Sequence, residues 1–189
     1  MKKVIFFDFF GVISTEVAVV YFKNKFDEKL AQKIKDKIFV RADAGEISEE
    51  ETYKLISLET GDSYQNIYDE WHKLPHIKED MVQYIEELKK DHKVYLLSNA
   101  ISSYLRKILK DHDLERLFDK IFISAEFKKI KPNPDFFEYV IEDLKLDPKD
   151  CVMIDDNPQN IAGAESIGIN GIVFKDVNSL KESIKNLEK

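Results

Sequence analysis

Acidic residues follow two short apolar runs that lie far apart in the chain. Asp8 comes directly after Val4–Phe7, and Asp155 and Asp156 come directly after Val152–Ile154. A carboxylate at the end of a buried strand loses its hydration, which is costly unless the group is paired or binds a metal. Adjacent carboxylates also repel each other, and oxygen-only ligands suit Mg²⁺. The pattern therefore predicts a magnesium site, with a turn or a helix cap as the alternative at each place.

Two further positions carry groups that bind anions. Ser98 and Asn99 follow the apolar run Val94–Leu97 and open a helical pattern. A hydroxyl group and free backbone N–H groups at a helix N-terminus form an anion site. Lys131 is closely followed by two prolines, which restrict the direction of the chain, and its ammonium can hold a phosphate as a point charge. A plain helix N-cap at Ser98 and a solvated lysine are the alternatives.

The four positions, at Asp8, Ser98-Asn99, Lys131 and Asp155-Asp156, need strands to bring them together. Five short apolar runs have the length of strands buried on both faces. They are Val4–Phe7, Val94–Leu97, Ile121–Ile123, Val152–Ile154 and Gly171–Phe174. From Val94 onward, helical patterns alternate with the runs, and this alternation predicts parallel strands with right-handed crossovers. We expect an α/β fold, a doubly wound parallel sheet, with the four polar groups at one edge of it.

A helical segment interrupts this alternation after the first strand. Ser48 opens a capping-box pattern, and Ser63 is placed to cap a further helix. Ligands bind at the carboxyl ends of parallel strands, so an insertion there is expected to cover the site. We expect an α/β core of residues 1–13 and 78–189 and a small helical cap of residues 14–77. A helical decoration without contact to substrate is the alternative.

Composition narrows the classes of partner. Among the 189 residues, 29 are basic and 36 acidic, for a net charge of −7. The sequence has no basic stripe that would bind the phosphate backbone of a nucleic acid. No apolar run approaches the roughly 20 residues of a membrane helix, and the N-terminal run is too short for a signal peptide. The single cysteine, Cys151, is typical of a reduced compartment. We expect a cytoplasmic protein that binds a small molecule, with no nucleic acid or membrane partner. The sequence does not indicate the oligomeric state.

In this order, the four positions resemble the motifs of the haloacid dehalogenase-like hydrolase superfamily. Asp8-Phe9-Phe10-Gly11-Val12 is similar to its first motif, Leu96-Leu97-Ser98-Asn99 to its second, Lys131-Pro132-Asn133-Pro134 to its third and Ile154-Asp155-Asp156-Asn157 to its fourth. The resemblance covers essentially the whole chain. It includes the helix that usually follows the fourth motif and a helical cap inserted after the first.

The resemblance implies a covalent mechanism in which Asp8 is the nucleophile and forms an aspartyl intermediate. In phosphatase members, Mg²⁺ is held by the nucleophile, by the backbone carbonyl two residues later and by an acid of the fourth motif. Here these are Asp8, the carbonyl of Phe10, and Asp155, with Asp156 supporting through water.

The resemblance also implies which residues face the substrate. Ser98, Asn99 and Lys131 would bind the phosphoryl group, and Lys131 would stabilise its charge during transfer. Phe10 would lie beside the substrate. Arg41, in the expected cap, could reach an anionic substrate, with a solvated helix end as the alternative.

Phe10 departs from the family pattern, because most phosphatases of the superfamily carry a second Asp there as general acid. An aromatic ring cannot move protons, and a general acid contributes about 10²–10⁴ in rate. Three functions remain open. The chain is a Mg²⁺-dependent phosphatase of small phosphorylated metabolites, such as sugar phosphates, or a 2-haloacid dehalogenase, or a weakly active member that binds a phosphorylated ligand or a protein partner. Asp155 and Asp156 favour the phosphatase, because dehalogenases of this superfamily need no metal.

Overall fold

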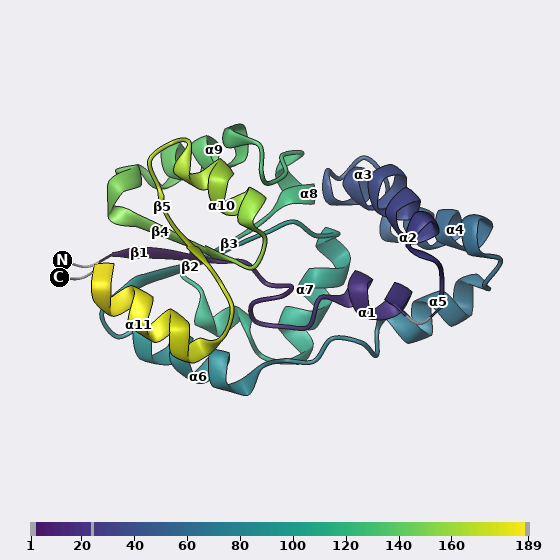
Figure 1. Ribbon diagram of the computed structural model, residues 1–189, viewed down its shortest axis with the longest axis horizontal. Coiled ribbons are helices and arrows are strands. Elements are labelled where there is room, and N and C mark those ends of the chain that lie inside the picture. The colour runs from purple at the N-terminus through teal and green to yellow at the C-terminus, as the bar shows by residue number, and fades with distance from the viewer. Residues whose placement is uncertain (1–2, 24, 188–189) are drawn as a thin grey trace.

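A five-stranded parallel sheet forms the centre of the molecule, seen in a computed structural model that describes residues 3–23 and 25–187 (Figure 1). Its strands are β1 (Val4–Phe7), β2 (Lys93–Ser98), β3 (Lys120–Ile123), β4 (Cys151–Asp155) and β5 (Asn170–Val173). Their order is β3-β2-β1-β4-β5, and all neighbours are parallel. The predicted α/β fold is confirmed, and the strand order reverses beside β1, where such sheets bind ligands.

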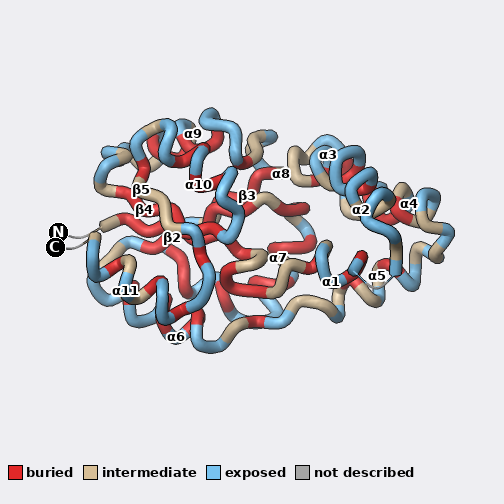
Figure 2. Tube along the Cα trace, viewed as in Figure 1, coloured by how far each residue is buried: buried red, intermediate tan, exposed pale blue. Residues whose placement is uncertain are grey.

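The central strands β1 and β4 are buried on both faces because helices cover both faces of the sheet. Val4 and Phe6 belong to one hydrophobic cluster, whereas Ile5 and Phe7 belong to the other, as the alternation of side chains along a strand requires. The helices over the first cluster are α9 (Pro134–Leu144) and α10 (Pro158–Glu165). Those over the second are α6 (Glu79–Leu88), α7 (Ser102–Asp111) and α11 (Val177–Leu187). Figure 2 shows the inner strands as a buried layer between these helices, whereas β5 at the edge of the sheet is only partly buried.

The segment between β1 and α6 is helical and lies beyond the end of β1, on the side opposite the chain termini (Figure 1). Its helices are α1 (Val17–Lys23), α2 (Glu28–Ile34), a π-helical turn (Lys35–Phe39), α3 (Val40–Asp43), α4 (Glu49–Thr60) and α5 (Tyr64–Trp71). Both predicted caps are confirmed: Ser48 accepts from the Glu51 amide at 3.1 Å and Ser63 from the Asn66 amide at 3.2 Å. The division into core and cap remains a prediction.

Some boundaries differ from those expected. The pattern after Ser63 predicts a helix through about Leu74, but α5 ends at Trp71, and β5 begins one residue before the predicted Gly171. Helix α1 was not expected, because three of its first four residues are valines, which have low helix propensity. Of the helices that the structure describes, none combines the length and apolarity needed to cross a membrane.

Polar and close-packed contacts join the helical segment to the ends of the strands. The Asp43 carbonyl accepts a 2.6 Å hydrogen bond from Ser124, whose hydroxyl in turn accepts from the Ala100 amide at 3.0 Å. Ser124 begins the short helix α8 (Ser124–Phe127), directly after β3. A Cβ atom at Gly45 would lie 2.3 Å from the Ala125 carbonyl oxygen, so only glycine allows this approach. The loop after α3 is therefore held at the carboxyl edge of the sheet.

Candidate active site

Asp8 follows β1 at the centre of the carboxyl edge of the sheet. Its Oδ1 atom accepts hydrogen bonds from the Phe9 amide at 2.7 Å and from Ser98 Oγ at 2.7 Å, and it lies 3.0 Å from Lys131 Nζ. No residue that the structure describes donates a hydrogen bond to Oδ2. The Asp8 side chain is 11% exposed, so Oδ2 is left to attack an electrophile or to bind a metal.

The Ser98 hydroxyl does not cap a helix, so the predicted helix start at Ser98 is wrong. Ser98 is the last residue of β2, and α7 begins only at Ser102, after the N-cap residue Ile101. Strand pairing places Ser98 next to Asp8, and its side chain is used in the hydrogen bond to that carboxylate. The site therefore contains a hydroxyl group aimed at Asp8.

Lys131 bridges two carboxylates in the interior. Its side chain is fully buried, and Nζ lies 2.6 Å from Asp155 Oδ2 and 3.0 Å from Asp8 Oδ1. Asn99 fixes its backbone from both sides: the Lys131 amide donates to Asn99 Oδ1 at 2.9 Å, and Asn99 Nδ2 donates to the Lys131 carbonyl at 2.8 Å. The Asn99 side chain thus positions Lys131, and its expected contact with substrate remains a prediction.

Asp155 is the most firmly held acid of the site. Its Oδ1 atom accepts from the Asn157 amide at 2.9 Å, and Asn160 Nδ2 donates to both carboxylate oxygens at 3.1 and 3.0 Å. Together with Lys131, these donors orient a carboxylate that is completely buried. The role of Asn160 was not predicted from the sequence. A polar residue on the inner face of α10, five positions after Asp155, was the available signal.

The electrostatics of the cluster follow from its burial. Burial and the neighbouring Asp155 charge raise the pKa of Asp8 well above its ordinary value, although Lys131 and Ser98 oppose this rise. Burial lowers the pKa of Lys131, but the charges of Asp155 and Asp8 outweigh it and the net pKa is raised. Burial and Asp155 also raise the pKa of Asp156. Such a cluster has more negative than positive charge and favours a bound cation.

Three carboxylates of the site could share one metal ion. Asp8, Asp155 and Asp156 each offer an oxygen, and these oxygens lie within 4.8 Å of one another. Opposite ligands of an octahedral Mg²⁺ ion are about 4.2 Å apart, twice the Mg–O distance of about 2.1 Å, so small movements would bring them onto one ion. No described backbone amide donates to the Phe10 carbonyl, the fourth expected ligand. This all-oxygen donor set fits Mg²⁺.

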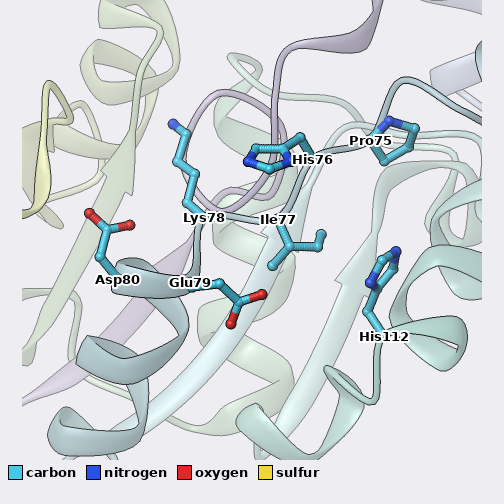
Figure 3. Close-up of a pocket in the computed structure, with 7 residues that line it drawn as sticks. All are labelled: Pro75, His76, Ile77, Lys78, Glu79, Asp80 and His112. Carbon is cyan, nitrogen blue, oxygen red and sulfur yellow. The ribbon is translucent and has the colours of Figure 1, made fainter.

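Gly11 makes room for this cluster. Its φ is +81°, and a Cβ atom there would lie 2.2 Å from Asp156 Oδ2. Lys78, just before α6, donates a 2.5 Å hydrogen bond from Nζ to the Gly11 carbonyl. Figure 3 shows Lys78 extending away from Glu79 and His112 in a surface depression beside the site. The turn after Asp8 is thus held by a lysine from a distant part of the chain.

Comparison with known proteins identifies the family. Residues 5–174 match the sequence profile described as haloacid dehalogenase-like hydrolase. The chain belongs to the haloacid dehalogenase-like hydrolase family. The resemblance inferred from the four motifs is confirmed. A finer resemblance, to the branch that includes sugar phosphatases and combines a non-acidic residue at the Phe10 position with the paired acids, remains a prediction.

Among solved structures, this haloacid dehalogenase-like hydrolase is similar to a HAD family enzyme, bt-2542, from Bacteroides thetaiotaomicron. The wild-type enzyme in complex with magnesium and inorganic phosphate has a TM-score of 0.79 and 27% identity, and the match covers 95% of this chain and 99% of that chain. Similarity at this level extends through both the sheet and the helical segment.

Two curated relatives match parts of the hydrolase. The flavin mononucleotide hydrolase 1 of Arabidopsis thaliana is 38% identical over 66 residues, which are 35% of this chain and 27% of that protein. The human N-acylneuraminate-9-phosphatase is 28% identical over 105 residues, which are 55% of this chain and 42% of that protein. The chain therefore spans less than half the length of these relatives.

Phe10 and Arg41 lie apart from the polar network of the hydrolase. The Phe10 ring packs against Phe9, with ring centroids 5.0 Å apart, and is stacked on Tyr104 of α7 at 6.1 Å. Arg41 is exposed, and its Nε atom lies 3.5 Å from an oxygen of Glu46. Among the residues that the structure describes, no hydrogen bond or ion pair links the Arg41 side chain to Asp8, Ser98 or Lys131. Its expected contact with substrate remains a prediction.

Two acids of the helical segment were missed by the sequence analysis. Burial and the charge of Asp156 raise the pKa of Glu16 to about 7, and burial and the charge of Glu16 raise the pKa of Asp43 to about 7. No sequence motif marks either residue. Glu16 lies eight residues after Asp8, just before α1, whereas Asp43 ends α3, and the burial of both depends on how the helical segment packs.

Proposed function

We propose that the chain is a Mg²⁺-dependent phosphatase that hydrolyses a small phosphorylated metabolite through an aspartyl-phosphate on Asp8. The observation that carries this proposal is the arrangement around that residue. Asp8 has one oxygen held by Ser98 and Lys131, while two further carboxylates have oxygens within 4.8 Å of its own. Such a site offers a nucleophile, a cation site and an ammonium in one place.

The reaction begins with attack of Asp8 Oδ2 on phosphorus. The bond from phosphorus to the leaving oxygen breaks, and an acyl phosphate forms on Asp8. Water then attacks phosphorus, the acyl phosphate bond breaks, and inorganic phosphate and free Asp8 are produced. Lys131 and Ser98 hold Oδ1, which leaves Oδ2 oriented for attack. Bound Mg²⁺ would neutralise negative charge on the phosphoryl oxygens and the carboxylates.

The relatives support this proposal. The bt-2542 structure was obtained with magnesium and inorganic phosphate, the metal and product expected here. The N-acylneuraminate-9-phosphatase acts on a phosphorylated small molecule, as its name states. We infer the same class of substrate for this chain, with residues 14–77 as the cap that covers it.

A dehalogenase is the second candidate, and Phe10 favours it. Halide leaves without a proton, so a dehalogenase needs no general acid at this position. The paired acids Asp155 and Asp156 favour the phosphatase, because three carboxylates around one point predict a metal-dependent reaction.

A parallel assay separates the two candidates. Purified protein is incubated with a panel of phosphate monoesters and acyl phosphates, with Mg²⁺ or with EDTA, and phosphate is measured. Chloride release from 2-chloropropionate is measured alongside. We expect phosphate release only with Mg²⁺, and none from the Asp8→Asn variant, which keeps the shape of the side chain but loses the nucleophile. Chloride release without metal would identify a dehalogenase instead.

A further inference from the structure

Two hydrogen-bond acceptors face the imidazole ring of His72, the residue that follows α5. Its Nδ1 atom lies 2.8 Å from the Tyr68 carbonyl oxygen, and its Nε2 atom lies 3.2 Å from Oε1 of Glu49, in the first turn of α4. A neutral imidazole carries one N–H group, so only the doubly protonated ring can donate to both oxygens. The contacts therefore indicate a charged His72 that forms an ion pair with Glu49.

Glu49 joins this ion pair to the core helix α7. Its second carboxylate oxygen, Oε2, accepts a hydrogen bond from the hydroxyl group of Ser103, in the first turn of α7. The Tyr53 hydroxyl donates to Oε1 at 3.2 Å. The first turns of α4 and α7 both favour a negative charge, because backbone N–H groups are unpaired at the start of a helix. Glu49 is thus a carboxylate that accepts from three helices, and its side chain is only 18% exposed.

Tyr104, the next residue of α7, contacts both the ion pair and the turn after Asp8. Its ring meets the His72 ring edge-on at a centroid distance of 5.1 Å and is stacked on the Phe10 ring at 6.1 Å. Its hydroxyl group is buried and donates to the Trp71 carbonyl at 2.9 Å. Because Phe10 is two residues after Asp8 and its backbone carbonyl is an expected metal ligand, the end of α5 is connected to the metal site through a single ring.

The other titratable groups around the imidazole leave its charge paired with Glu49. Burial and the nearby carboxylate raise the pKa of Tyr53 and of Tyr104, so both hydroxyl groups stay neutral. The Tyr68 ring packs on the imidazole with centroids 4.0 Å apart. On α7, Lys107 is paired with Asp111 at 2.7 Å. The opposite charge that faces the imidazolium is therefore that of the Glu49 carboxylate.

We propose that Glu49 and His72 are positioning residues of the site. As an ion pair, they hold the helical segment on α7, so that Tyr104 keeps Phe10 and its backbone carbonyl in place for bound Mg²⁺. Histidine ordinarily changes its charge between pH 5 and pH 8. The pair is therefore complete at the acid end of this range and is lost at the alkaline end, when the ring gives up one of its two protons. The inference rests on the proposed function for its effect on turnover, but not for its effect on metal affinity.

The test measures Mg²⁺ affinity by calorimetry at about pH 6 and about pH 8. Glu49→Gln and His72→Gln each remove one charge of the pair. Glu50→Gln is the matched control for the first, because Glu50 is the next residue of α4 and forms an exposed pair with Lys54 at 2.5 Å. His112→Gln is the control for the second, in an exposed histidine at the end of α7. Melting temperature shows which variants are folded, and either variant of the pair is sufficient for the test.

We expect Glu49→Gln and His72→Gln to raise the Kd for Mg²⁺ about 10-fold over wild type at about pH 6, as substitutions behind a metal ligand commonly do. At about pH 8 the wild type has itself lost the ion pair, so the ratio of variant to wild-type Kd should approach one. The two control variants should bind Mg²⁺ as wild type does at both pH values. Protonation of the metal-binding acids affects every protein alike, so it cancels in these ratios.

The sign of the effect in His72→Gln separates positioning from simple electrostatics. Removal of a positive charge would by itself make Mg²⁺ bind more tightly, whereas loss of the ion pair makes it bind more weakly. Tighter or unchanged binding by this variant would overturn the inference. A ratio of Kd values above one that is the same at both pH values would also overturn it, because it would show a packing role that is independent of charge.

Phosphate release separates this inference from the proposed function. If the Kd ratios are as expected but the wild type releases no phosphate with Mg²⁺, the proposed function fails and the positioning of the metal site stands. If the wild type releases phosphate with Mg²⁺ and all Kd ratios are one, the inference fails and the proposed function stands. If the wild type binds no Mg²⁺, both fail.

Discussion

Removing the buried ammonium of Lys131 should destabilise the protein more than any substitution of a surface lysine. Lys131→Met keeps much of the side-chain volume and removes the charge. Nζ lies 2.6 Å from Asp155 Oδ2 and 3.0 Å from Asp8 Oδ1, and the side chain has no exposure, so both carboxylates lose a buried partner. Breaking a buried ion pair by removing one partner costs about 3–5 kcal/mol.

For a chain of this length, the lost free energy of unfolding corresponds to a lower melting temperature. For 150–250 residues, 1 kcal/mol corresponds to about 2–4 °C, so we expect the Lys131→Met variant to melt about 6–20 °C lower than wild type. Lys107→Met is the matched control, because Lys107 is about half exposed and pairs with Asp111 at 2.7 Å on the surface of α7. Water screens such an exposed pair, so its loss should leave the melting temperature almost unchanged.

The loss in the Lys131→Met variant should depend on pH and on Mg²⁺. Lys131 lowers the pKa of Asp8, so without it the folded-state pKa rises further above the unfolded value. The loss is therefore smallest below the unfolded pKa of about 4 and grows as pH rises through the folded-state pKa. Mg²⁺ at about 100 times the variant's Kd should stabilise the variant by about 2.7 kcal/mol relative to EDTA.

The assay is thermal unfolding of both variants between acidic and neutral pH, in EDTA and in Mg²⁺. A loss below about 1 kcal/mol at neutral pH, or a loss that grows on acidification, would refute the buried charge network as described.

Further substitutions test the metal site and the nucleophile. Gly11→Ala should lower Mg²⁺ affinity at least about 10-fold in calorimetry, because its Cβ would lie 2.2 Å from Asp156 Oδ2, whereas Gly61→Ala, also at positive φ but with nothing within 4 Å, should only destabilise the fold. Equal Mg²⁺ affinities of these two variants would contradict the placement of Asp156. Ser98→Ala removes the 2.7 Å donor to Asp8, which is worth about 1.5–3 kcal/mol, so kcat/KM should fall about 10- to 100-fold in a phosphate-release assay, and an unchanged value would show that the hydroxyl is dispensable.

The sheet and the cluster at its edge could be predicted because both depend on local sequence. An apolar run as short as Val4–Phe7 has the length of a strand covered on both faces, and parallel strands bring their carboxyl ends to one edge. These two rules are enough to predict that Asp8, Ser98 and Asp155 lie together. Their hydrogen-bonded arrangement agrees with that expectation, and their roles in catalysis remain predictions.

Contacts that depend on tertiary packing could not be predicted. Asn99 was expected to bind substrate, but which atoms its amide would meet depends on how Lys131 approaches from another crossover. Asn160 reaches Asp155 only because α10 packs back on β4. Glu16 follows Asp8 by eight residues, but its partial burial depends on how the helical segment packs, which neither spacing nor periodicity encodes.

The most direct test of the central claim is to detect a phosphoryl group on Asp8. The protein is mixed with Mg²⁺ and a substrate with a good leaving group, quenched in acid during turnover, digested and examined by mass spectrometry. We expect one phosphoryl group on the peptide that contains Asp8, absent in EDTA and absent from the Asp8→Asn variant. Mg²⁺-dependent phosphate release by the Asp8→Asn variant, with no phosphoryl group on this peptide of the wild type, would contradict the account.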